Sequence, residues 1–177
     1  MSVAITTAVS KAIPIRTFIC CASLESGFHD IIPELDCKDP SLISESALPW
    51  PVREPVNSEG APRPIGPYSQ GMRTEELFFC SGQIGADPKT GELAEGVVAQ
   101  TDQALRNLSS VLTAAGLGIN RVIKTTVFLV DISEYALMND EYAKHFSAPF
   151  PARSTVQVAA LPRGARVEIE AIAVKAS

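Results

Sequence analysis

The spacing of apolar residues changes twice between residues 77 and 130, and this feature constrains the fold most strongly. Residues 77–84 form a short apolar run that is typical of a buried strand. Residues 97–115 then place their apolar side chains on one stripe of a helix, which Gly116 and Gly118 end. This stripe consists of Ala104, Leu105, Leu108, Val111, Leu112 and Ala115. Residues 121–130 return to the alternation of a strand, in which one face carries Ile123, Thr125, Val127 and Leu129.

Shorter segments on both sides complete the pattern. Residues 52–57 and 68–73 are predicted to be extended, with a turn rich in Pro and Gly between them. Ser133 can cap a second helix that reaches residue 146, and its apolar side carries Tyr135, Met138, Tyr142 and Phe146. Residues 154–160 and 166–174 are predicted as a hairpin joined by Leu161-Pro-Arg-Gly-Ala165. This order predicts an α+β fold, a mixed sheet with both helices on one face.

The first 51 residues differ in character from residues 52–177, which we assign as the functional domain. The first 24 contain Lys11 and Arg16 but no Asp or Glu, a bias typical of organelle transit peptides. Residues 25–51 are acidic and proline-rich, as linkers often are. Translation from a misplaced start codon would give such an extension equally well. We expect no catalysis from this extension. We expect the protein in the cytoplasm, or in an organelle stroma or matrix if the extension is a transit peptide.

Composition argues against several classes of function. The net charge of −5 gives no electrostatic footprint for nucleic acid, and no apolar run is long enough to cross a bilayer. No C-x-x-C occurs, and the two histidines are far apart in sequence, so a Cys/His zinc site is not expected. We expect Cys80 to be a small buried apolar residue. The cysteines and histidines are Cys20, Cys21, Cys37, Cys80, His29 and His145.

An arginine and a glutamate near the end of the chain point to a pocket for a small carboxylic acid. Arg153 and Glu168 lie on the two strands that are predicted to pair. A guanidinium can bind a carboxylate through two parallel hydrogen bonds, and a carboxyl group can move protons or orient water. An Arg–Glu pair across two strands is also a common structural salt bridge, so the pair alone does not decide between these interpretations.

Four segments together are more specific than this pair. They are Ala61-Pro-Arg-Pro-Ile-Gly-Pro-Tyr-Ser-Gln70, Ser81-Gly-Gln-Ile84, Met138-Asn-Asp-Glu-Tyr142, and Pro151-Ala-Arg-Ser154 followed by Leu161-Pro-Arg-Gly164 and Val167-Glu-Ile-Glu170. In this order they closely resemble the reactive intermediate deaminase family, the RidA or YjgF type, over residues 52–177. The resemblance implies a chorismate-mutase-like α+β domain that assembles as a homotrimer with pockets at the subunit interfaces.

The resemblance also implies an activity and a site. Such proteins hydrolyse 2-aminoacrylate, 2-iminopropanoate and 2-iminobutanoate to 2-oxo acids and ammonia, protect pyridoxal-phosphate enzymes from these compounds, and use no cofactor or metal. Arg153 would bind the substrate carboxylate, and Glu168 would be the acid/base group or position water. The other predicted substrate-binding residues are Tyr68, Ser81, Gly82 and Asn139.

Each of these residues also has a structural interpretation. Tyr68 could be a turn aromatic, Asn139 a local hydrogen-bonding residue of its helix, Ser81 a structural hydroxyl, and Gly82 a point of close backbone approach. The next acidic residue, Glu170, should share a face with Glu168 and is predicted to be a structural partner of Arg166 or Arg153.

One residue departs from a known pattern, and two other functions compete with the deaminase. Some family members have a cysteine where this chain has Thr155, which removes any switching based on a thiol but not the hydrolysis.

A non-catalytic trimer that binds 2-oxo acids or amino acids is the main alternative. Activity on nucleic acid is the third hypothesis, and the near balance of basic and acidic residues after residue 51 gives it little support.

Overall fold

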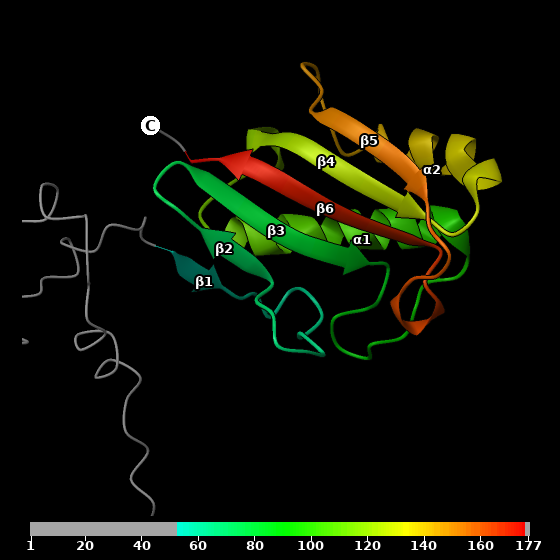
Figure 1. Cartoon of the computed structure of the whole chain (residues 1–177), viewed down its shortest axis with the longest axis horizontal. Coiled ribbons are helices and arrows are strands. Elements are labelled where there is room, and N and C mark those ends of the chain that lie inside the picture. The colour runs from blue at the N-terminus through cyan, green and yellow to red at the C-terminus, as the bar shows by residue number, and fades with distance from the viewer. Residues whose placement is uncertain (1–52, 176–177) are drawn as a thin grey trace, which may run out of the picture. The chain divides into compact units, whose positions relative to one another are not determined.

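The computed structural model describes residues 53–175, and in this part of the chain six strands form one sheet with both helices behind it (Figure 1). This arrangement confirms the predicted α+β fold with a mixed sheet. The predicted extension, residues 1–51, lies outside the described residues. The elements are β1 (Glu54–Val56), β2 (Gly71–Arg73), β3 (Leu77–Ile84), α1 (Gly96–Ala114), β4 (Val122–Leu129), α2 (Tyr135–Tyr142), β5 (Ala152–Gln157) and β6 (Val167–Val174).

The strand order β1-β2-β3-β6-β4-β5 shows that the predicted C-terminal hairpin is wrong. β6 pairs antiparallel with both β3 and β4, whereas β5 pairs, among the described strands, only with β4, in parallel. The two burial patterns explain this order. Every second residue of β6 is buried, which suits a central strand, whereas β5 is mostly exposed and suits a sheet edge.

The apolar stripe of α1 forms the centre of the core. Its leucines, Leu105, Leu108 and Leu112, are fully buried, and they belong to the same cluster as Val127 and Ile169 of the sheet. Gly85 allows α1 to lie close to the end of β3, because a methyl group there would overlap the backbone of Gln100. The helical stripe and the β-branched strand therefore form the core that the sequence predicts.

Two local predictions in this region are wrong. Ile123 is 46 % exposed because the register between β4 and β6 shifts between Val122 and Lys124, and Val122 takes the buried place. Ser133 does not cap the second helix. Its backbone N–H donates to the Asp131 carboxylate (2.9 Å) at the start of a 3-10 turn, and α2 begins two residues later.

The buried amide of Gln70 holds the loop that precedes β2. Its Nε2 donates to the carbonyl oxygens of Ser58 (3.2 Å), Ala61 (3.2 Å) and Pro62 (2.8 Å), and its Oε1 accepts from the Ser58 N–H. The side chain is 2 % exposed, so these backbone groups have little access to replacement water. Gln70 therefore fixes the loop that leads to Tyr68.

Replacing Gln70 by leucine should destabilise the domain by about 3 kcal/mol, because several partly buried backbone groups would lose the one hydrogen-bond partner that they have within residues 53–175. The melting temperature should fall by roughly 10 °C. Gln103→Leu is the matched control, since Gln103 is only half-buried and its amide makes a single bond, to Asn107. Equal melting temperatures for the two variants would contradict the anchoring role of Gln70.

The face of the sheet opposite the helices carries apolar side chains. Alternation along β3, β4 and β6 directs Phe79, Phe128 and Ile172 to this side, and β5 contributes Val156. Phe79 is 42 % exposed and Val156 is 43 % exposed. Within residues 53–175 both helices pack on the other face, so this open face is covered by neither of them (Figure 1).

Candidate active site

The Arg153 side chain points from β5 towards α2, which surrounds its guanidinium with polar and aromatic groups. Its Nη2 donates to Asn139 Oδ1 (2.7 Å) and to the Tyr135 hydroxyl oxygen (3.0 Å). The guanidinium carbon lies 4.5 Å from the ring centroid of Tyr142 and 5.7 Å from that of Tyr135. Cation–π attraction and two hydrogen bonds therefore orient the guanidinium before any ligand arrives.

The Tyr142 ring is itself fixed. Its hydroxyl shares a buried hydrogen bond with Thr125 Oγ1 (2.8 Å), and its ring stacks on Phe146 with centroids 4.5 Å apart. The sequence predicted that Tyr135 and Tyr142 belong to the apolar side of the helix and missed their contact with Arg153. Their spacing of seven residues, which places both rings on one helix face, is a signal that could have revealed it.

Ser81, Gly82 and Glu168 lie together on the open face of the sheet, and Tyr68 lies near Ser81 in the loop that precedes β2. The Gly82 backbone lies directly against the Glu168 carboxylate, since a methyl group on Gly82 would overlap Glu168 Oε1. The predicted close approach at Gly82 is therefore real, and the approaching group is a side chain. The Ser81 hydroxyl donates to the Ser69 carbonyl (2.6 Å), which leaves its oxygen free to accept a hydrogen bond but not to donate one.

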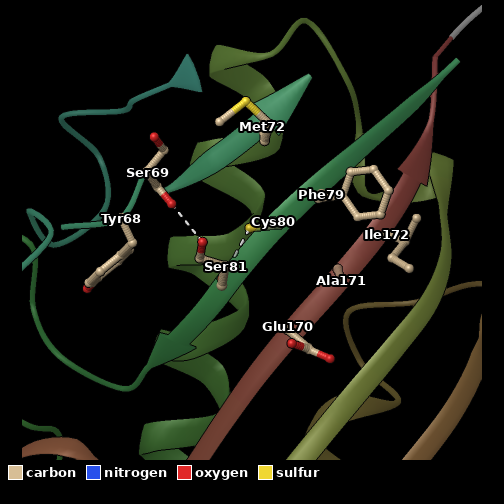
Figure 2. A pocket seen from close by; sticks show the side chains of 9 residues that line it. All are labelled: Tyr68, Ser69, Met72, Phe79, Cys80, Ser81, Glu170, Ala171 and Ile172. Carbon is tan, nitrogen blue, oxygen red and sulfur yellow. Dashed lines mark hydrogen bonds between the residues drawn. The ribbon is translucent and has the colours of Figure 1, made fainter. Parts of the chain in front are cut away.

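A hollow of about 370 Å³ lies beside this group, between β2, β3 and β6 (Figure 2). Tyr68, Ser81 and Glu170 all line this hollow. Its wall is mainly apolar and consists of Tyr68, Ser69, Met72, Phe79, Cys80, Ser81, Glu170, Ala171 and Ile172. Arg153 and Asn139 are not part of this wall.

The structure therefore divides the predicted site residues into two groups on opposite faces of the sheet. Arg153 is paired in register with Thr125, whose side chain points towards α2, whereas Glu168 is paired with Phe128 on the other face. β4 also separates their strands, so their Cα atoms are at least about 10 Å apart. A cross-strand Arg153–Glu168 salt bridge within one chain is excluded by this geometry.

Burial raises the pKa of Glu168 above its usual value, and the nearby charge of Glu170 raises it further. Both carboxylates lie on the open face, as the strand alternation predicts. The predicted pairing of Glu170 with Arg166 or Arg153 is wrong. Arg166 binds Glu134 through Nε and Nη2 at 2.6 to 3.1 Å, and Arg153 is held by α2.

Two residues near these groups contain atoms that react or bind readily when accessible. Cys80 is buried, as predicted, and burial raises the pKa of its thiol to about 12. The Thr155 hydroxyl oxygen is buried two residues beyond Arg153, and among residues 53–175 it has no hydrogen-bond partner. The Cys80 thiol is therefore an inert packing group. The Thr155 hydroxyl is an unsatisfied polar group on the same sheet face as Arg153.

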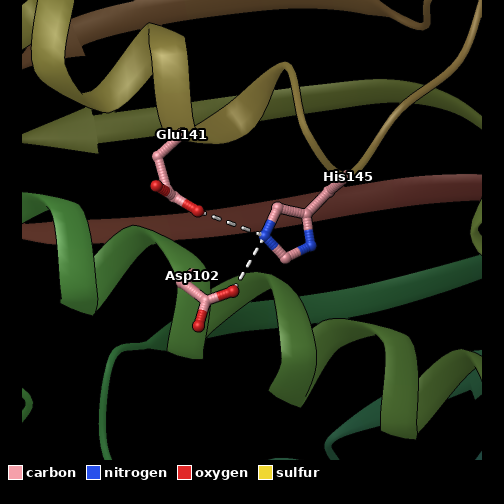
Figure 3. A group of neighbouring side chains, drawn as sticks. All are labelled: Asp102, Glu141 and His145. Carbon is pink, nitrogen blue, oxygen red and sulfur yellow. Dashed lines mark ion pairs between the residues drawn. The ribbon is translucent and has the colours of Figure 1, made fainter.

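Asp102, Glu141 and His145 form the one group within residues 53–175 that brings three potential metal ligands together (Figure 3). His145 Nε2 lies 3.1 Å from Asp102 Oδ1 and 3.9 Å from Glu141 Oε1. Each carboxylate is also paired with a cation, Arg106 at 2.8 Å and Lys144 at 2.7 Å. These cations oppose a divalent ion, so the group is better explained as a polar contact between α1 and the residues that follow α2.

This sheet, with both helices on one face, and the two groups of site residues define an α+β domain of the YjgF type. The crystal structure of the YjgF gene product from E. coli is 42 % identical in sequence to this chain, with a TM-score of 0.66. The match covers 70 % of this chain and 99 % of the E. coli chain. Residues 58–175 match the family described as Endoribonuclease L-PSP. The chain belongs to this family, the reactive intermediate deaminases of the RidA or YjgF type.

Several curated relatives carry deaminase names. The 2-iminobutanoate/2-iminopropanoate deaminase of Mus musculus is 48 % identical over 125 residues, which cover 70 % of this chain and 93 % of the relative. The protein named Reactive Intermediate Deaminase A, chloroplastic, from Arabidopsis thaliana is 48 % identical over 122 residues, 68 % of this chain and 65 % of the relative. Between residues 53 and 175 this chain has no helix long and apolar enough to span a membrane.

Proposed function

We propose that this protein hydrolyses small 2-imino acids and their enamine tautomers to 2-oxo acids and ammonia. The substrates are 2-aminoacrylate with its tautomer 2-iminopropanoate, and 2-iminobutanoate, and their removal protects pyridoxal-phosphate enzymes. The oriented guanidinium of Arg153 is the observation that carries the proposal, because it is a ready site for a substrate carboxylate. The deaminase names of relatives at 48 % identity support it.

The active site is proposed to form between two copies of the chain in a homotrimer. One copy would supply Arg153 and Asn139, and the next would supply Tyr68, Ser81, Gly82 and Glu168. Two observations support this assembly. The groups face opposite sides of the sheet, where one small substrate cannot reach both, and the open face exposes apolar side chains such as Phe79 and Val156 that a second chain would cover.

The chemistry requires only water and proton transfers. The carboxylate of the imino acid would bind Arg153, which places the C=N carbon towards Glu168 of the neighbouring copy. Glu168 would take a proton from water as the oxygen adds to this carbon, and would pass it to the imine nitrogen. It would then take the second proton from the new hydroxyl and pass it to the same nitrogen, so that ammonia leaves as the C=O bond forms. The Ser81 hydroxyl donates its hydrogen bond to the Ser69 carbonyl, so its oxygen would accept a hydrogen bond from the imine N–H. Water is the only co-reactant, and the proposal includes no cofactor.

The raised pKa of Glu168 gives this mechanism a pH dependence. Glu168 must be ionised to take the proton from water, so kcat/KM should fall as pH falls through its pKa. Glu170→Gln removes the charge that raises this pKa, and the acidic limb of the profile should move to lower pH. The limb should still lie at a higher pH than an ordinary glutamate would give, because burial is the larger cause of the raised pKa of Glu168. A limb that does not move, or moves upward, would contradict this assignment.

The location follows the same proposal. The protein would act in the cytoplasm, or in an organelle if residues 1–51 are a transit peptide, and the chloroplastic relative supports the second option.

The proposed activity is tested by the decay of an imine produced in place. Threonine dehydratase with L-threonine generates 2-iminobutanoate, and semicarbazide traps what remains after a fixed delay. Less trapped imine with the wild-type protein, and no such loss with folded Glu168→Ala, supports hydrolysis. Unchanged decay together with binding of 2-oxobutanoate would instead identify a non-catalytic binding protein.

A further inference from the structure

Some of the N–H donors of the Arg153 guanidinium are already used in hydrogen bonds within the protein. A guanidinium carries five N–H donors, and the two on Nη2 already bind Asn139 and Tyr135. A carboxylate can be bound through two parallel bonds in two ways, by Nε with Nη2 or by Nη1 with Nη2, and both use Nη2. Arg166 shows the first arrangement in this same protein, with Nε and Nη2 on Glu134.

One of the two acceptors must therefore leave before a ligand carboxylate can use both of its oxygens. The Asn139 bond is shorter, at 2.7 Å, and partly buried, whereas the Tyr135 bond measures 3.0 Å and is exposed. The Tyr135 side chain lies at the surface, with the residue 41 % exposed. The phenol oxygen is also a neutral acceptor, which a charged carboxylate outcompetes at a guanidinium. Tyr135 is the partner that a ligand displaces.

We propose that the Tyr135 hydroxyl occupies, in the empty site, the position of one oxygen of the ligand carboxylate. Tyr135 thereby sets the affinity of the site for carboxylates, since every ligand that is bound through both oxygens must break its bond to Arg153. The inference rests on the proposed role of Arg153 as the carboxylate site. It adds a residue that tunes selectivity, because a ligand that needs only one N–H of Arg153, such as an amide, does not have to displace Tyr135.

Tyr135→Phe tests the inference, because it removes the competing oxygen and keeps the ring. The probe is 2-oxobutanoate, the product of the proposed reaction, and its binding to the full chain is measured by titration calorimetry. The dissociation constant should fall about three- to tenfold, which corresponds to one modest hydrogen bond that no longer has to be broken. The uncharged analogue 2-oxobutanamide should bind both proteins equally. Unchanged or weaker binding of 2-oxobutanoate would overturn the inference.

Tyr142→Phe is the matched control. It also deletes one hydroxyl from a ring beside Arg153, and that ring lies closer, at 4.5 Å, but the hydroxyl binds Thr125 and not the guanidinium. This variant should not bind 2-oxobutanoate more tightly. Equal tightening in both phenylalanine variants would show that loss of a nearby hydroxyl, and not release of Nη2, changes the affinity, and would overturn the inference.

Failure of this inference can be distinguished from failure of the proposed function. If the wild type hydrolyses 2-iminobutanoate and Tyr135→Phe binds 2-oxobutanoate no more tightly, the inference fails and the function stands. If the wild type has no such activity, but binding needs Arg153 and is tightened by Tyr135→Phe, the inference stands and the function fails. Absence of 2-oxobutanoate binding in both proteins overturns the inference.

Discussion

Arg153→Ala should lower kcat/KM for 2-iminobutanoate by about a thousandfold. The variant removes both hydrogen bonds to the substrate carboxylate and the positive charge that attracts it. Arg153→Lys keeps the charge but cannot make two parallel bonds, and should lose about a hundredfold. Imine decay measured over a range of substrate supply gives these values.

The loss must be separated from damage to the fold, because Arg153 also ties β5 to α2 through Asn139 and the ring of Tyr142. Thermal unfolding and the oligomeric state of each variant provide this check. Arg121→Ala is the control for loss of an exposed arginine, since Arg121 lies in a 3-10 turn away from both groups of site residues. A well-folded Arg153→Ala protein that kept its activity would contradict the assignment of the carboxylate site.

Gly82→Ala should reduce turnover by about a hundredfold or more, although it adds only one methyl group. The added Cβ would overlap Glu168 Oε1, so the carboxylate would have to turn away from its position on the open face. A catalytic group displaced by about 1 Å typically costs two orders of magnitude. The effect should appear in kcat more than in KM, because Arg153 would still bind the carboxylate.

A double-mutant cycle shows whether this effect passes through Glu168. Glu168→Ala alone should abolish most of the activity and also create room for the new methyl group. Adding Gly82→Ala to Glu168→Ala should then reduce the remaining activity little further, since residues that act together are not additive. A full second hundredfold loss in the double variant would mean that Gly82 acts by another route, such as a direct contact of its backbone with the substrate.

The sequence predicts the helices, the class of fold and the family because these depend on repeated local signals. The stripe of α1 and the alternation of β4 each contain enough apolar positions to fix the period and the buried face. The motif around Gly82 and that around Arg153 likewise lie in short continuous segments. These features require no knowledge of which strands pair.

Apart from the local error at the Ser133 cap, the wrong predictions depend on pairing in space. Strands that follow one another in sequence usually pair, so β5 and β6 suggested a hairpin, yet β4 lies between them. The exposure of Ile123 depends on a one-residue shift against β6, which the alternation within β4 does not reveal. The separation of Arg153 from Glu168 follows from the same strand order. The Tyr135 contact depends on where α2 lies over β5, and the spacing of Tyr135 and Tyr142 shows only that the two rings share a helix face.

Mixing two inactive variants tests most directly the central claim, that each active site is formed by two chains. Arg153→Ala retains Glu168, and Glu168→Ala retains Arg153, so a mixed trimer contains some interfaces at which both residues are intact. If equal amounts assemble at random, about a quarter of the interfaces carry both, and the account predicts about a quarter of wild-type imine hydrolysis. A mixture that stays as inactive as its two components, although co-purification of two tags proves that mixed oligomers have formed, would contradict the account.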